Sequence, residues 1–242
     1  MSDSIGHFTV VVPAAGVGKR MLSSCPKQYL TIENTTILEH TVQRLLSHPA
    51  IDHVVIALGE NDEYLPTTSL ANNPNVTKVI GGKERVDSVL SGLKHLSAIK
   101  EPWVLVHDAA RPCVRHSDLT QLITYCLEND HGGLLASPVR DTMKQANNKQ
   151  RVASTLDRSQ MWHALTPQMY KTAELTSAIN SALANGIDIT DESSAMEAQG
   201  YVSGLVKGSS DNIKITQPED LLLAEFILNQ QNNNLAAEAI CE

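Results

Sequence analysis

The chain has 242 residues, 42% of them hydrophobic, which suits one large α/β domain over residues 1–242 better than two small ones. Its formal net charge of −8 argues against a nucleic-acid binder, so a polyanionic substrate must be held by a local basic cluster. No apolar run could span a membrane, the first residues lack a secretory signal, and the four cysteines form no C-x-x-C pair, so we expect a soluble cytoplasmic protein without a zinc site.

The first predicted strand leads into a loop of small residues. The apolar run 10–12 is followed by small residues from Pro13 to Gly18, with Arg20 and Lys27 beyond them. Small side chains let backbone N–H groups approach a ligand, and the two cations suit a chain of phosphates. A nucleoside triphosphate is therefore favoured, although two glycines also fit an ordinary turn. Met21 nearly excludes the dinucleotide fingerprint of a dehydrogenase, and Pro13 with Arg20 excludes a Walker A loop.

Strand and helix patterns then alternate along the chain. We expect strands at 54–58, 76–80, 103–106, 133–136 and 213–215, and helices at 37–46, 86–96, 119–127, 170–183 and from 216 to about Leu228. The alternation predicts an α/β fold with a single doubly wound, mostly parallel (Rossmann-like) sheet and helices on both faces. Ligands bind such sheets at the carboxyl ends of strands, where Gly16, Gly82 and Asp108 each follow an apolar run.

Two segments break this rhythm. Residues 139–158 are polar and contain few apolar side chains, so we expect a projecting hairpin, an arm, or a functional loop. Residues 230–242, rich in Asn and Gln at their start, are expected to form a frayed or disordered tail.

Three places carry candidate chemistry. Asp108 and Arg111 follow a buried strand, and one carboxylate with substrate phosphates commonly holds Mg²⁺, although Asp108 also fits a turn cap with Arg111 as its surface partner. Gly82, with Arg85 and Ser88 beyond it, allows close approach to a base or ribose, or marks an ordinary turn. Lys214, between two isoleucines, either points into a charged site or lies at a sheet edge, the edge being slightly favoured.

Six segments together resemble the 2-C-methyl-D-erythritol 4-phosphate cytidylyltransferase family. They are Val12–Met21, Pro26–Leu30, Val106–Pro112, Arg140–Thr142, Thr190–Glu192 and Asp211–Lys214, in order within about residues 8 to 228. The resemblance implies a nucleotidyltransferase of isoprenoid biosynthesis by the non-mevalonate route. It would transfer the cytidylyl group of CTP to 2-C-methyl-D-erythritol 4-phosphate and release pyrophosphate. It also implies Mg²⁺ or another divalent cation as cofactor, and a homodimer in which the arm crosses to the second subunit.

Carried over residue by residue, the resemblance also implies the sites. The CTP site would comprise Ala14, Ala15, Gly16, Gly18, Gly82, Arg85, Ser88 and Ala109. The methylerythritol phosphate site would comprise Asp108, Arg111, Thr142, Arg158, Thr166, Thr190 and Lys214, with Asp108 also holding the metal and with Thr142 and Arg158 serving the partner's site. Arg20, Lys27, Arg158 and Lys214 would be catalytic, offsetting charge as the acceptor phosphate attacks the α-phosphorus in line.

Two other functions stay open. A cytidylyltransferase for another polyol phosphate, such as ribitol 5-phosphate, would share the first loop and the Asp108 region and differ in the acceptor pocket. A nucleotide-binding module without catalysis would bind CTP and release no pyrophosphate with any acceptor.

Overall fold

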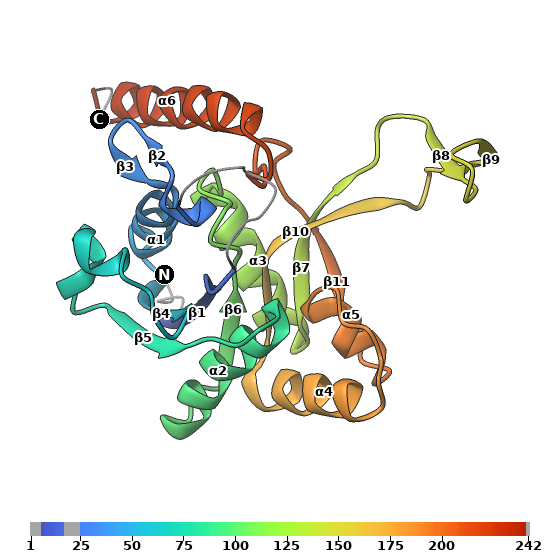
Figure 1. Ribbon diagram of the computed structural model, residues 1–242, viewed down its shortest axis with the longest axis horizontal. Helices are drawn as coiled ribbons and strands as arrows, with labels where there is room; N and C mark the ends of the chain where they lie inside the picture. The colour runs from blue at the N-terminus through green and yellow to red at the C-terminus, as the bar shows by residue number, and fades with distance from the viewer. Residues whose placement is uncertain (1–5, 17–24, 241–242) are drawn as a thin grey trace.

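A seven-stranded sheet forms the centre of the computed structural model, which describes residues 6–16 and 25–240, with side chains described to residue 233 (Figure 1). The strand order is β11-β7-β10-β6-β1-β4-β5. The bounds are β1 Phe8–Pro13, β4 Ile51–Leu58, β5 Val76–Ile80, β6 Trp103–Val106, β7 Gly133–Pro138, β10 Trp162–Lys171 and β11 Gly204–Lys207. β10 runs antiparallel to β6 and β7, and the other neighbouring pairs are parallel. The predicted mostly parallel sheet is therefore confirmed.

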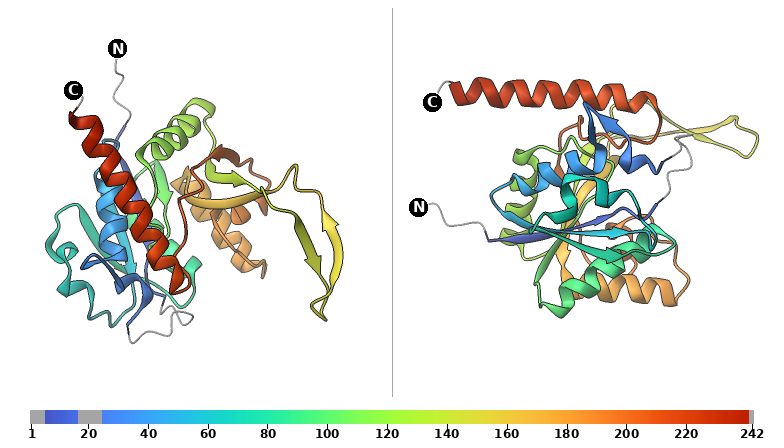
Figure 2. Two further views of the ribbon diagram at one scale, coloured as in Figure 1. Left: turned by 90° about the horizontal axis from the view of Figure 1, so that it is seen from above. Right: turned by 60° about the vertical axis from the view of Figure 1, so that its left-hand side comes forward.

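Helices cover both faces of this sheet, because its central strands are apolar on both sides. In β1, Val10 and Val12 belong to one buried cluster, which includes residues of α1 (Ile37–Leu46) and α3 (His116–Asn129). Val11 belongs to a second cluster with residues of α2 (Arg85–Ala98), α4 (Thr172–Ala184) and α5 (Glu192–Glu197). Figure 2 shows α6 (Glu219–Ile240) lying across the outside of the α1 side.

Three local expectations are wrong. Residues 162–171 form the long strand β10, so the helix expected from Tyr170 begins at Thr172. Residues 213–215 form no strand; the last strand is β11, and Ile213 and Ile215 instead pack in the cluster under α6. The last helix starts at Glu219 and continues to Ile240, past the end expected near Leu228, so residues 230–240 are helical rather than a frayed tail.

Residues 139–158 form the expected projecting hairpin. β8 (Met143–Ala146) and β9 (Val152–Leu156) pair antiparallel in a two-stranded sheet that extends away from the body of the molecule (Figure 1). Another two-stranded sheet, formed by β2 (Thr31–Ile32) and β3 (Thr35–Thr36), directly precedes α1 in the chain. Within the described part of the chain, no helix is long and apolar enough to cross a membrane.

Candidate functional site

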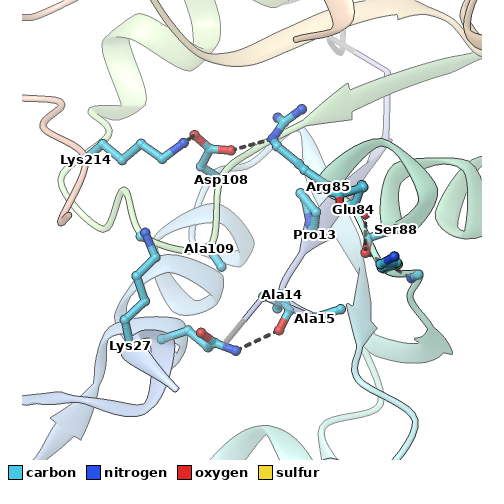
Figure 3. Close-up of a pocket in the computed structure, with 15 residues that line it drawn as sticks. Pro13, Ala14, Ala15, Lys27, Glu84, Arg85, Ser88, Asp108, Ala109 and Lys214 are labelled. Atoms are coloured by element: carbon cyan, nitrogen blue, oxygen red, sulfur yellow. Dashed lines mark hydrogen bonds and ion pairs between the residues drawn. The ribbon is translucent and has the colours of Figure 1, made fainter. Parts of the chain in front are cut away.

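A pocket opens at the point where the order of strands along the chain reverses. The chain runs outward from β1 to β4 and β5, and α2 then returns it to β6 on the other side of β1. In α/β sheets a ligand crevice forms outside the carboxyl ends of the strands at such a switch. The pocket there is lined by Pro13, Ala14, Ala15, Gly16, Lys27, Gln28, Gly82, Lys83, Glu84, Arg85, Ser88, Asp108, Ala109, Ala110 and Lys214 (Figure 3). Gly16, Gly82 and Asp108 thus share one rim, as expected.

Buried polar contacts and close backbone packing shape the side of this pocket formed by the loop after β1 and the start of α2. Nε2 of the buried Gln28 donates to the carbonyl oxygen of Ala14 at 2.7 Å and holds the loop after β1 in place. A Cβ atom on Gly82 would lie 2.1 Å from Cβ of Asp87, so this position tolerates only glycine, and its N–H donates to Oγ of Ser88 at 3.1 Å. Gly18 and Arg20 lie outside the described residues.

Asp108 lies at the centre of a cluster of cations. Its Oδ2 is 2.8 Å from Nζ of Lys214, and its Oδ1 accepts a hydrogen bond from Nε of Arg85 at 3.0 Å (Figure 3). Nε of Arg111 lies 3.5 Å from Oδ2. Burial alone would raise the pKa of this carboxyl, but Arg85 and Lys214, and then Arg111, hold the pKa well below its usual range. Asp108 is therefore ionised, and it is not a turn cap on the surface.

Sequence reasoning assigned no role to Glu192, which holds Arg85. Glu192 is 2% exposed, and its two oxygens accept from Nη1 and Nη2 of Arg85 at 2.6 and 3.1 Å. Burial lowers the pKa of Arg85, but the charges of Glu192 and Asp108 outweigh burial and raise it. The contact connects α2 with α5 and aims Nε of Arg85 at Asp108. In the sequence, Asp191 and Glu192 are only two adjacent acidic residues within the segment Thr190–Glu192, and nothing in that pattern indicates a partnership with Arg85.

A second pocket adjoins the first. It is lined by Arg85, Asp108, Arg111, Ala164, Leu165, Thr166, Gln168, Thr190, Asp191 and Lys214. Arg85, Asp108 and Lys214 line both pockets and form their common wall. The structure thus brings together five of the seven residues that the family resemblance implies for the acceptor. The other two, Thr142 and Arg158, are exposed on the arm and line neither of these pockets; Nη1 of Arg158 donates to the carbonyl oxygen of Arg140.

The second pocket has a buried polar floor. The fully buried ring of His107 contacts Oγ1 of Thr166 through Nδ1 and the carbonyl oxygen of Arg111 through Nε2, at 3.1 and 3.0 Å. Burial lowers the pKa of His107 to about 4, so the ring is neutral at pH 7. Nη1 of Arg111 donates to the carbonyl oxygen of Asn212 at 2.6 Å, which fixes the guanidinium beside Asp108.

The acidic side chains here can hold a metal ion only with help from a ligand. No group of three or more His, Cys, Asp or Glu side chains is arranged to hold a metal among residues 6–16 and 25–233, whose side chains the structure describes. Both oxygens of Asp108 already contact cations, although a carboxylate oxygen can accept more than one contact. Since Mg²⁺ commonly binds one carboxylate together with substrate phosphates, the residues fit Mg²⁺ when phosphates supply most of its oxygen ligands.

Comparisons with known proteins agree on one family. A family model described as 2-C-methyl-D-erythritol 4-phosphate cytidylyltransferase matches residues 8–230. A relative of that name from Colwellia psychrerythraea is 59% identical over 235 residues, covering 94% of this chain and 97% of the relative. One from Vibrio vulnificus is 56% identical, covering 96% and 99%. The solved structure of that enzyme from Francisella tularensis is 33% identical with a TM-score of 0.77, covering 92% of this chain and 100% of the other.

Proposed function

This chain belongs to the 2-C-methyl-D-erythritol 4-phosphate cytidylyltransferase family, and we propose that its reaction takes place in the two pockets that meet at Asp108. As a member, the chain is a nucleotidyltransferase of isoprenoid biosynthesis. It transfers the cytidylyl group of CTP to 2-C-methyl-D-erythritol 4-phosphate and gives 4-diphosphocytidyl-2-C-methyl-D-erythritol and pyrophosphate.

The observation that carries the assignment of the site is the wall shared by the two pockets. CTP occupies the pocket formed by the loop after β1, Gly82 and Ser88, and the acceptor occupies the pocket formed by Arg111, Thr166 and Thr190. The bond-forming atoms then meet beside Lys214 and Arg85. The chain has a net charge of −8, so a local cluster of cations is needed to bring two polyanions together.

The chemistry in this proposal is charge stabilisation. An oxygen of the acceptor phosphate attacks the α-phosphorus of CTP in line, and the bond to pyrophosphate breaks. The attacking oxygen is already anionic, so no nucleophile or strong general base of the protein is required. Lys27 and Arg20 stabilise charge on the α-phosphate, and Lys214 positions the acceptor phosphate. Each such contact contributes about 2 to 4 kcal/mol to lowering the barrier, the range for one preorganised donor.

Mg²⁺ completes the proposal as the cofactor of CTP. Asp108 is the carboxylate that would hold it, together with oxygens of the triphosphate. When bound there, it would offset the negative charge that develops on the pyrophosphate leaving group.

We also propose a homodimer in which the arm, residues 139–158, completes the partner's site. Thr142 and Arg158 belong to the family's acceptor set, yet they line neither pocket of their own chain. An arm that projects from the body can carry them to a second copy (Figure 2).

The experiment that tests this function measures pyrophosphate release from CTP and Mg²⁺ with a panel of acceptors. We expect release with 2-C-methyl-D-erythritol 4-phosphate and little with ribitol 5-phosphate or sugar 1-phosphates. Preference for ribitol 5-phosphate would assign another polyol phosphate. CTP binding without release for any acceptor would make the chain a nucleotide-binding module.

A further inference from the structure

His107 has a hydrogen-bond pattern with one consistent assignment of protons. Its Nε2 lies 3.0 Å from the carbonyl oxygen of Arg111, and a carbonyl oxygen only accepts, so Nε2 carries the proton. The ring is fully buried and its two partners are a carbonyl and a hydroxyl, neither of which can balance a positive charge. The Asp108 carboxylate is already paired with Lys214 and Arg85. Nδ1 is therefore unprotonated and accepts a hydrogen bond from the Thr166 hydroxyl.

This assignment fixes what Thr166 can offer to a ligand. A hydroxyl has one hydrogen and two lone pairs. The hydrogen of Thr166 goes to Nδ1 of His107 at 3.1 Å, and one lone pair accepts the backbone N–H of Asp108, also at 3.1 Å. What remains for a molecule in the second pocket, which Thr166 lines, is the other lone pair.

We propose that His107 is a positioning residue that makes Thr166 a pure hydrogen-bond acceptor, so that Thr166 receives a hydroxyl of the acceptor substrate and disfavours its phosphate. The inference rests on the proposed function, in which the second pocket holds a polyol phosphate. A fully ionised phosphate, the main form at pH 7, has no hydrogen to donate, and its oxygen would face the lone pair of Thr166. A polyol hydroxyl can donate there. The substrate is thus turned with its carbon chain toward Thr166 and its phosphate toward Lys214.

His107 also holds the turn that carries two charged side chains of the site. The N–H of Arg111 donates to the carbonyl oxygen of Asp108 at 3.1 Å and closes the turn. Nε2 of His107 donates to the carbonyl oxygen of Arg111 at the end of the turn, and the N–H of Asp108 at its start donates to Oγ1 of Thr166. Because the two contacts of the ring differ, two substitutions separate them. In His107→Gln the amide reaches the position of Nε2 and can donate to Arg111, whereas in His107→Asn its oxygen reaches the position of Nδ1 and can accept from Thr166.

The proton assignment is tested first, without substrate. Long-range ¹H–¹⁵N correlation spectra of the ¹⁵N-labelled protein at pH 7 report which ring nitrogen carries hydrogen. We expect Nε2 of His107 to carry a proton and Nδ1 to be unprotonated. A ring with a proton on Nδ1 would overturn the inference, whatever reaction the protein catalyses.

Kinetics then test the consequence. We expect His107→Gln to raise the KM for 2-C-methyl-D-erythritol 4-phosphate about tenfold, as for loss of one hydrogen bond, while the KM for CTP and the melting temperature stay near wild type. His107→Asn should restore most of the acceptor KM. His131→Gln is the matched control, because His131 contacts the Gly132 carbonyl and lines neither pocket.

A double-mutant cycle separates this role from simple destabilisation. In a Thr166→Val background, where no hydroxyl is left to orient, His107→Gln should add no further rise in acceptor KM. The same tenfold rise in both backgrounds, or an equal rise for CTP, would contradict the inference. If the wild type releases no pyrophosphate with any polyol phosphate, the proposed function fails, and the spectra still decide the state of His107.

Discussion

Nζ of Lys214 lies 2.8 Å from Oδ2 of Asp108, so the loop before α6 is connected to the turn after β6 at the wall that the two pockets share. Asp108 keeps this lysine in place while the substrates are absent. The ammonium group can form a second ion pair with an arriving phosphate without moving far from Asp108.

The first prediction concerns Lys214. In Lys214→Ala we expect pyrophosphate release at saturating substrates to fall at least tenfold, because one preorganised donor is lost. Lys207→Ala is the control, since Lys207 is an exposed lysine on β11 and lines neither pocket. Equal rates for the two variants would remove Lys214 from the mechanism.

Lys27 faces the same pocket from the side opposite Arg85 and is proposed to contact the triphosphate (Figure 3). We expect Lys27→Ala to lower turnover at least tenfold while circular dichroism and the melting temperature show a folded protein. Its Nζ donates to the carbonyl oxygen of Ile215 at 3.0 Å, a contact whose loss costs little beside the loss of charge. Lys94→Ala, on the exposed face of α2, is the control; a turnover near wild type for Lys27→Ala would refute the role.

Glu192 is predicted to support both the fold and the site. Glu192→Gln leaves the partly buried Arg85 without the charge of its bidentate partner, so we expect the free energy of unfolding to fall by about 2 kcal/mol or more. Urea denaturation measures this, with Glu128→Gln on the exposed face of α3 as the control. If both variants unfold at the same urea concentration, the Arg85–Glu192 contact does not stabilise the protein.

The crossing of the arm can be tested by mixing two inactive variants. In a heterodimer of Lys27→Ala and Arg158→Ala, an arm that crosses gives one site with both residues intact. Random mixing should therefore recover about a quarter of wild-type turnover, since half of the dimers are mixed and each has one intact site of two. An arm that serves its own chain would give no recovery above the separate variants.

The stability of the protein should depend on pH through His107. Its pKa is about 4 in the folded protein against 6.5 as the ordinary value, because of burial, so the unfolded chain takes up the proton first as the pH falls. The contribution of His107 to the free energy of unfolding is therefore fully present above pH 6.5. It falls between pH 6.5 and 4 by about 1.4 kcal/mol per pH unit at most. His48 and His116, whose pKa values burial also lowers, act in the same direction.

Urea denaturation at pH 7, 6 and 5 measures this dependence. The His107→Gln variant should show a flatter profile than the wild type, because the largest contributor is gone. Parallel profiles for the two proteins would contradict the assignment.

The sequence predicts the centre of this fold well, because buried parallel strands and amphipathic helices leave strong local patterns. Those patterns fail where tertiary contacts decide the structure. β10 contains Pro167 and a shift of register between Ala164 and Gln168, so it shows no simple alternation. Ile213 and Ile215 alternate around Lys214 because they pack beneath α6.

The candidate site follows the same division. Residues beside strand ends, such as Gly16, Gly82 and Asp108, could be placed on one rim from the sequence, because topology alone brings them together. The partners of Arg85 could not be predicted. Its assignment to CTP remains a prediction, and its guanidinium is held by Asp108 and Glu192, which come from distant parts of the chain.

The most direct test of the central claim is a crystal structure of the protein with Mg²⁺, a CTP analogue that cannot transfer its cytidylyl group, and 2-C-methyl-D-erythritol 4-phosphate. We predict that the triphosphate lies against Ala14–Gly16 and Lys27, and that the acceptor phosphate lies beside Lys214 with a hydroxyl of its carbon chain on Thr166. Phosphates bound away from the wall formed by Arg85, Asp108 and Lys214 would contradict the account.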